Sequence, residues 1–125
     1  QLSTVSGLGD YLGELALSAD GRFLFAGSDG NPASAADGRL SVLDAETLEV
    51  VAQRSIPLAN NLALDGDRVY VSAGFDSALF PRAGVDEYVF DQSSPSLVLV
   101  EHHFLGVNSF VFGELNDGIE KITVR

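Results

Sequence analysis

Leu15-Ala-Leu-Ser-Ala-Asp-Gly-Arg-Phe-Leu-Phe-Ala-Gly27 and Leu62-Ala-Leu-Asp-Gly-Asp-Arg-Val-Tyr-Val-Ser-Ala-Gly74 are two stretches of this chain that repeat one pattern. In each, a short apolar strand leads through an Asp-Gly turn into a second apolar strand, which is typical of a tight β-hairpin. Each hairpin is followed by a glycine-containing loop and by two further strand-like segments. The sequence therefore predicts two copies of a four-stranded antiparallel unit.

Alternation and β-branched or aromatic residues predict eight strands. They cover 15–18, 22–26, 40–43 and 48–53 in the first unit, and 61–64, 68–73, 85–90 and 96–101 in the second. A short helix over 45–52 is the competing prediction for the fourth segment, because several of its residues favour helix. Residues 27–38 and 74–84 are expected to form long loops, and loops of this length often carry binding residues.

The spacing between the two copies is about 45 residues, which is typical of β-propeller blades. Propellers close with about four to eight blades. This sequence holds blade-like units at about 13–54 and 60–102 and an incomplete unit at about 104–125, as a single domain or as a fragment of a propeller. We expect an all-β fold of antiparallel four-stranded blades, a partial β-propeller, with a small β-sandwich as the alternative.

An isolated pair of blades leaves apolar sheet faces in water. The expected partners are therefore further blades, supplied by the same parent chain, by another subunit or by other copies.

Parts of both units resemble the repeats of the YVTN and lactonase-like β-propeller group. Tyr70-Val-Ser-Ala73 is similar to the group's Tyr-Val-Thr-Asn strand, and Val42-Leu-Asp-Ala-Glu-Thr47 is similar to its strand that ends in Asp before a Thr-rich turn. The resemblance covers about two-thirds of the chain and implies a propeller fold. It implies no single activity, because the group includes surface-layer proteins, sugar-lactone hydrolases and subunits of quinone-dependent dehydrogenases.

The composition is strongly acidic, with 18 Asp and Glu against 7 Lys and Arg and a formal net charge of −11. Nucleic acid is not an expected partner, because its binding depends on cationic side chains that neutralise phosphates. No apolar run approaches the roughly 18 residues that span a bilayer. The chain begins at Gln1, which we interpret as a processed or truncated end. An extracellular, periplasmic or cell-surface location is the expectation.

Cysteine is absent, which excludes disulfides, thiolate nucleophiles and Cys-type zinc sites. Calcium is the one cofactor considered, since it takes six to eight oxygen ligands. The candidate ligands are acids beside turns and loops: Asp65, Asp67, Asp29 and Asp37, with Asp76, Asp86 and Glu87 as further loop acids. The alternative is that these acids only form turns, which is the usual role of Asp beside Gly.

Phe75, Leu79 and Phe80 are large apolar residues within a predicted loop. They either fold back onto the core or form an exposed patch that binds a partner. They are therefore the candidate partner-binding residues.

His102 and His103 are adjacent and are the only histidines of the chain. Successive side chains of a strand point to opposite faces. Both imidazoles can therefore bind one metal only if the strand ends there. Neither is tied by spacing to a serine and an acid, so no hydrolytic triad is predicted.

No catalytic set emerges from these residues. The first hypothesis is a non-catalytic β-propeller segment that works as an extracellular or cell-surface binding or scaffold module. The alternative is a portion of a propeller enzyme, either a lactonase-like hydrolase or a quinoprotein-type dehydrogenase subunit.

Overall fold

A computed structural model describes residues 5–8, 12–29, 38–56, 59, 61–73 and 82–107 of the chain. These residues form two four-stranded antiparallel sheets, each with its strands in sequence order. Sheet 1 consists of β1 (Leu12–Leu17), β2 (Phe23–Ser28), β3 (Arg39–Asp44) and β4 (Val50–Ser55). Sheet 2 consists of β5 (Leu62–Asp65), β6 (Arg68–Ala73), β7 (Arg82–Asp91) and β8 (Ser96–Val107). The described part of the chain is all-β.

All eight predicted strands are present, and the bounds of several differ from the prediction. The competing helix at 45–52 is wrong, because residues 45–47 form a turn and β4 begins at Val50. Strand β7 begins at Arg82, inside the predicted loop, and β8 continues to Val107, beyond the predicted end at Glu101. Residues 108–125, assigned to an incomplete third unit, lie outside the described residues.

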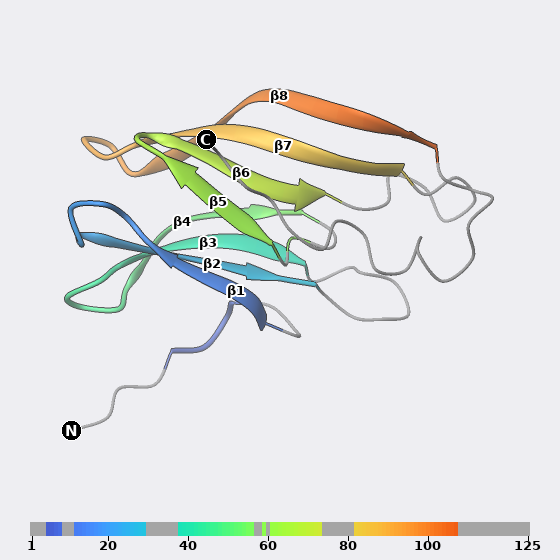
Figure 1. The fold of residues 1–125 in the computed structure, drawn as a ribbon. Helices are drawn as coiled ribbons and strands as arrows, with labels where there is room; N and C mark the ends of the chain where they lie inside the picture. Colours follow the sequence, from blue (N-terminus) through green and yellow to red (C-terminus); the bar gives the residue numbers. More distant parts are fainter. Residues whose placement is uncertain are drawn as a thin grey trace.

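The two sheets are stacked as layers, with β1 beside β5 and β4 beside β8 (Figure 1). Their facing sides form one hydrophobic core. Its buried members include Phe23, Phe25, Leu40 and Val42 from sheet 1, and Leu62, Val69, Val71, Tyr88, Phe90 and Leu97 from sheet 2. We call these facing sides the inner faces and the opposite sides the outer faces. Both an arc of a propeller and a sandwich are compatible with this stacking.

Aromatic rings join the inner faces. The Phe90 ring meets the Phe23 ring at a centroid distance of 4.8 Å and the Phe25 ring at 5.5 Å, both edge to face. Edge-to-face pairs are favoured because the positive ring edge meets the negative ring face. The chain from sheet 1 to sheet 2 passes closely over β2, where the Ala59 amide donates a hydrogen bond to the Ser28 carbonyl at 3.1 Å. A polar link from Glu14 Oε1 to the Leu62 amide, at 2.9 Å, joins β1 to β5.

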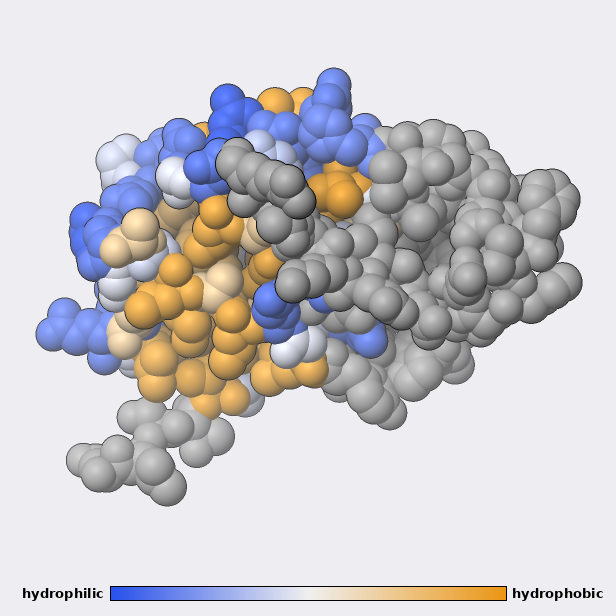
Figure 2. Space-filling view, viewed as in Figure 1, coloured by the Kyte–Doolittle hydropathy of each residue, from blue (hydrophilic) through white to orange (hydrophobic). Residues whose placement is uncertain are grey.

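The outer face of sheet 1 is apolar along β1. Leu15 and Leu17 pair with Ala26 and Leu24 of β2, whereas Ala16 pairs with Phe25 and packs on the core. Because side chains alternate along a strand, the two leucines point away from sheet 2. They are 57% and 58% exposed. Figure 2 shows hydrophobic residues gathered on the side of the molecule where β1 lies.

Residues 5–8 lie against the polar part of this outer face. The Gly7 carbonyl accepts hydrogen bonds from Arg39 Nη1 at 3.0 Å and from Gln53 Nε2 at 2.8 Å. Both donors belong to β3 and β4. The leucines of β1 remain exposed beside this contact.

Candidate functional site

Two histidine–carboxylate pairs lie on opposite faces of sheet 2, between β7 and β8. The register places Asp86 opposite His102 and Glu87 opposite Glu101, with His103 opposite Val85. The strand does not end at the histidines, so their side chains point to opposite faces as strand alternation requires. The two imidazoles therefore cannot share one metal ion.

An irregularity of the β7–β8 ladder makes these pairs possible. The register shifts between Glu87 and Tyr88, because Tyr88 pairs with Leu99 whereas Glu87 pairs with Glu101. One extra residue on β8, Val100, is thereby accommodated as a β-bulge. Without this shift, Glu101 would stand opposite Asp86, and two like charges would face each other.

The inner-face pair is formed by Asp86 and His102. Asp86 is 9% exposed, and its Oδ1 pairs with His102 Nδ1 while its Oδ2 accepts a hydrogen bond from the Tyr88 hydroxyl at 3.1 Å. A buried carboxylate needs such partners, since an unpaired one is costly. Burial and the neighbouring Asp86 charge raise the pKa of Tyr88 to about 12, so its hydroxyl stays protonated and keeps donating.

Two neighbours complete the surroundings of this pair. Gly84 makes room for the His102 ring, because a Cβ at position 84 would lie 2.6 Å from the ring atoms Cε1 and Nε2. The guanidinium of Arg54, from β4 of sheet 1, lies 5.4 Å from the centre of the Tyr88 ring. A cation at this distance from an aromatic face is attracted to it. The inner-face pair is thus supported from both sheets.

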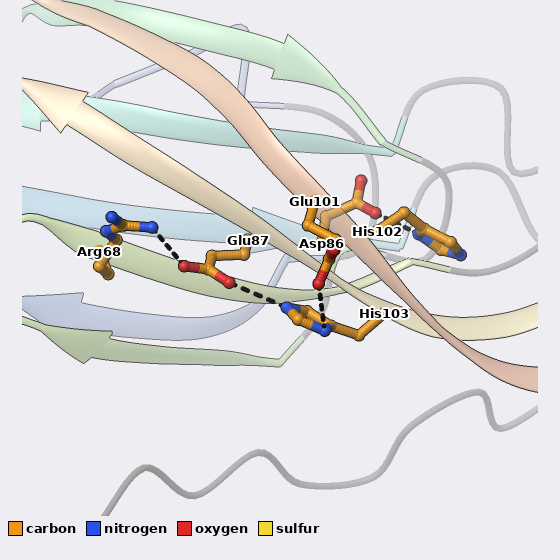
Figure 3. Close-up of polar contacts among 6 residues, drawn as sticks. All are labelled: Arg68, Asp86, Glu87, Glu101, His102 and His103. Carbon is orange, nitrogen blue, oxygen red and sulfur yellow. Dashed lines mark hydrogen bonds and ion pairs between the residues drawn. The ribbon is translucent and has the colours of Figure 1, made fainter.

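The outer-face network consists of Arg68, Glu87, Glu101 and His103 (Figure 3). Arg68 Nη1 donates a hydrogen bond to Glu87 Oε2, and His103 Nε2 lies 2.9 Å from Glu87 Oε1. His103 Nδ1 lies 3.1 Å from Glu101 Oε2. The imidazole therefore lies between two carboxylates, and it donates to both only as the doubly protonated imidazolium.

This network does not have the form of a metal site. Glu87 and Glu101 contact different nitrogens of the His103 ring, so their oxygens do not converge with one ring nitrogen on a common point. Among the described residues, no group of three or more His, Cys, Asp or Glu side chains is arranged to hold a metal ion. The network instead satisfies charges on a sheet surface.

The calcium candidates are separated in the fold. Asp65 ends β5 and is exposed, and Asp67 lies in the following turn, 3.9 Å from Arg68 Nε. Asp29 follows β2; its Oδ1 is buried without a hydrogen-bond partner among the described residues, and burial raises its pKa. Asp37 and Asp76 lie outside the described residues. Calcium binding stays a prediction.

Asp86 and Glu87 were interpreted as loop acids, and that placement is wrong because both lie within β7. The partner-binding candidates Phe75, Leu79 and Phe80 lie outside the described residues. Sequence reasoning did not single out the exposed Leu15 and Leu17. Their signal was present in the Leu-Ala-Leu alternation, which marks a strand with one apolar face.

The fold and the site together define a two-sheet all-β unit with exposed leucines on the outer face of sheet 1 and an ionic network on the outer face of sheet 2. Comparison with known proteins adds no relative: no protein-family model, no curated protein and no solved structure matches this chain. Within the described residues, no helix has the length and hydropathy that a membrane span requires.

Replacing Glu87 by glutamine is expected to make stability less dependent on acid pH. The hydrogen bond from His103 and the contact with Arg68 hold the pKa of Glu87 below its ordinary 4.5. A carboxyl with a lowered pKa in the folded state stabilises that state above its unfolded pKa, and this contribution disappears as pH falls through the folded pKa. Urea unfolding at pH 7, 5, 4 and 3 measures the effect.

The free-energy difference between wild type and Glu87→Gln should be largest at pH 7 and should shrink below about pH 4.5. Glu46→Gln, in an exposed turn, is the matched control and should show no such change. A difference that is equal at pH 7 and pH 3 would contradict the assignment.

Proposed function

We propose that this chain is part of a β-propeller of the YVTN and lactonase-like group and that it works as a non-catalytic binding or scaffold module. We place it outside the cytoplasm, in the extracellular space, the periplasm or at the cell surface. The two successive four-stranded sheets support the propeller, because β1 lies beside β5 and β4 beside β8, as the inner and outer strands of neighbouring blades do.

One observation carries the proposal: equivalent leucines of the repeat differ in burial. Leu62 and Leu64 begin the second unit and belong to the core or pack against it, covered by the inner face of sheet 1. Leu15 and Leu17 hold the same positions in the first unit and are more than half exposed. A further sheet stacked on sheet 1 would bury them in the same way.

The energetic gain from such stacking is substantial. Burying an exposed leucine completely contributes about 1.5 to 3 kcal/mol. Leu15 and Leu17 together would therefore contribute about 2 to 4 kcal/mol beyond their present burial. This gain favours association with a further blade over leaving the face in water.

The variant Leu15→Gln with Leu17→Gln tests whether the outer face of sheet 1 exposes an apolar surface to solvent. The wild-type chain should enhance the fluorescence of a neutral apolar dye, and the variant should reduce that enhancement to roughly half or less, because the two exposed leucines of this face become polar. Its melting temperature should stay close to that of the wild type, since both leucines are mostly exposed.

Val98→Gln with Val100→Gln is the matched control, because it removes two exposed apolar residues from β8 instead. This control should retain most of the dye signal. A monomeric wild type that binds no dye would indicate a closed sandwich and would contradict the propeller proposal.

A second candidate function is a portion of a propeller enzyme, a lactonase-like hydrolase or a quinoprotein-type dehydrogenase subunit. The observation in its favour is the pair of Asp86 and His102, since a buried carboxylate that orients an imidazole is a common arrangement for general-base catalysis. Hydrolysis of a simple lactone by the chain, abolished by His102→Ala, would favour this candidate. We expect no hydrolysis above the buffer rate.

A further inference from the structure

The outer faces of the two sheets carry different kinds of side chains. Within the chain, the inner face of sheet 1 covers sheet 2. If the stack continued in the same way, the outer face of sheet 2 would cover the next sheet. The inner face of sheet 1 is apolar, with Phe23, Phe25, Leu40 and Val42 all buried. The outer face of sheet 2 should be apolar too if it were built to receive the same kind of neighbour.

Charged side chains occupy part of the outer face of sheet 2 instead, where β7 and β8 pair. In sheet 1, Val42 stands opposite Ala52 across β3 and β4. In sheet 2, Glu87 stands opposite Glu101 across β7 and β8. Arg68 and His103 complete the outer-face network described above. The outer face of sheet 2 also carries Val85, Val89 and Val98, but it holds an ionic network at a place where the inner face of sheet 1 is aliphatic.

This network opposes head-to-tail association of identical chains. Within the chain, β5 lies beside β1 and β8 beside β4, so such association would place Glu87 and Glu101 of one copy against the outer side of β3 and β4 of the next. Burying this ionic network in an interface between sheets carries a large desolvation cost, because its side chains lose their contact with water. The charges therefore make the outer face of sheet 2 a poor match for the outer face of sheet 1.

We propose that the outer face of sheet 1 binds a further blade-like sheet that presents aliphatic and aromatic side chains, and that the network of Arg68, Glu87, Glu101 and His103 excludes a second copy of this chain from that position. The inference rests on the proposed propeller function and names the chemistry of its partner. The required partner face resembles the inner face of sheet 1, which already covers Leu62 and Leu64. The outer face of sheet 1 is thus the binding surface for a sheet that differs from sheet 2 of this chain.

A variant of this chain, which we call the converted probe, takes the place of the proposed partner sheet in the binding experiment. It carries Arg68→Leu, Glu87→Val, Glu101→Ala and His103→Leu, which replace the ionic network by aliphatic side chains. It also carries Leu15→Gln and Leu17→Gln, so that it associates only through sheet 2. The labelled probe is mixed with the unlabelled wild-type chain and followed by sedimentation velocity.

The converted probe should bind the wild-type chain as a one-to-one complex, at least about tenfold more tightly than a control that carries only Leu15→Gln and Leu17→Gln. Leu15→Gln with Leu17→Gln in the unlabelled chain should abolish the complex. Circular dichroism melting must show that the probe folds cooperatively. If it does not fold, Glu87→Gln with Glu101→Gln replaces the four conversions, and a smaller gain in binding is expected.

Two results would overturn the proposal. Equal binding of probe and control would mean that the ionic network does not exclude a second copy. A folded probe that forms no complex would mean that the outer face of sheet 1 does not accept an aliphatic sheet face. In the second case, dye binding to the wild-type chain would still support the propeller, so that failure of this inference and failure of the proposed function are distinguishable.

Discussion

Replacing Gly27 by alanine is expected to unfold the chain or to destabilise it by more than about 3 kcal/mol, beyond the usual range for overpacked cores. A Cβ at position 27 would lie 1.9 Å from the Ala59 carbonyl oxygen. Real Cβ atoms do not approach an oxygen this closely, and the obstacle is backbone, so it cannot turn aside as a flexible side chain would. The connection between the two sheets would have to lift off β2, which would remove the buried Ala59 and disturb Leu62.

Thermal and urea unfolding measure this effect. Gly66→Asn is the matched control, because Gly66 has a positive φ of 61° but open space around it. Asparagine adopts such a backbone conformation with little strain, so the control should lose less than about 1 kcal/mol. A Gly27→Ala chain that unfolds like the wild type would show that the connection does not cross β2 at this point.

The strands could be predicted from sequence because their signals are local. Alternating apolar residues and Asp-Gly turns give the hairpins of β1 with β2 and of β5 with β6, and the structure confirms both. Strand ends were less predictable. His102 and His103 lie within β8 although the sequence placed the strand's end before them, since polar residues on a strand surface resemble the start of a loop.

The pairing of acids and histidines could not be predicted, because it depends on one residue of register. Asp86 meets His102 only because the bulge at Val100 shifts the ladder. The sequence shows two adjacent acids and two adjacent histidines, and it does not show which of them stand opposite each other. A hairpin that starts from the turn at residues 92–95 with regular pairing would instead oppose Asp86 and Glu101.

The difference in burial between the leucines of β1 and those of β5 could not be predicted from the sequence either. Both units contain the same Leu-Ala-Leu strand, and this likeness suggests equivalent surroundings. Only the stacking of the sheets shows that one pair of leucines is covered and the other is open. Position in the stack is a property of the assembled repeats, so a local pattern does not contain it.

Phe90→Ala is expected to destabilise the chain by about 3 to 5 kcal/mol, the usual cost of removing a buried phenylalanine ring. Phe90 is 4% exposed, and its ring contacts both Phe23 and Phe25 across the interface of the two sheets. Alanine would leave a cavity between two rings that belong to the other sheet. Since the free energy of unfolding of a domain is only about 5 to 15 kcal/mol, the variant would lose a large part of it.

Urea unfolding followed by circular dichroism gives the free-energy change. Val89→Ala is the matched control, because Val89 is the neighbouring residue of β7, is only partly buried and points to the outer face. It should lose less than about 1.5 kcal/mol. Phe90→Leu, which keeps most of the buried volume, should fall between the two. Equal losses for Phe90→Ala and Val89→Ala would mean that the inner faces do not pack as one core. The stacking from which the partner of sheet 1 is inferred would then lose its physical basis.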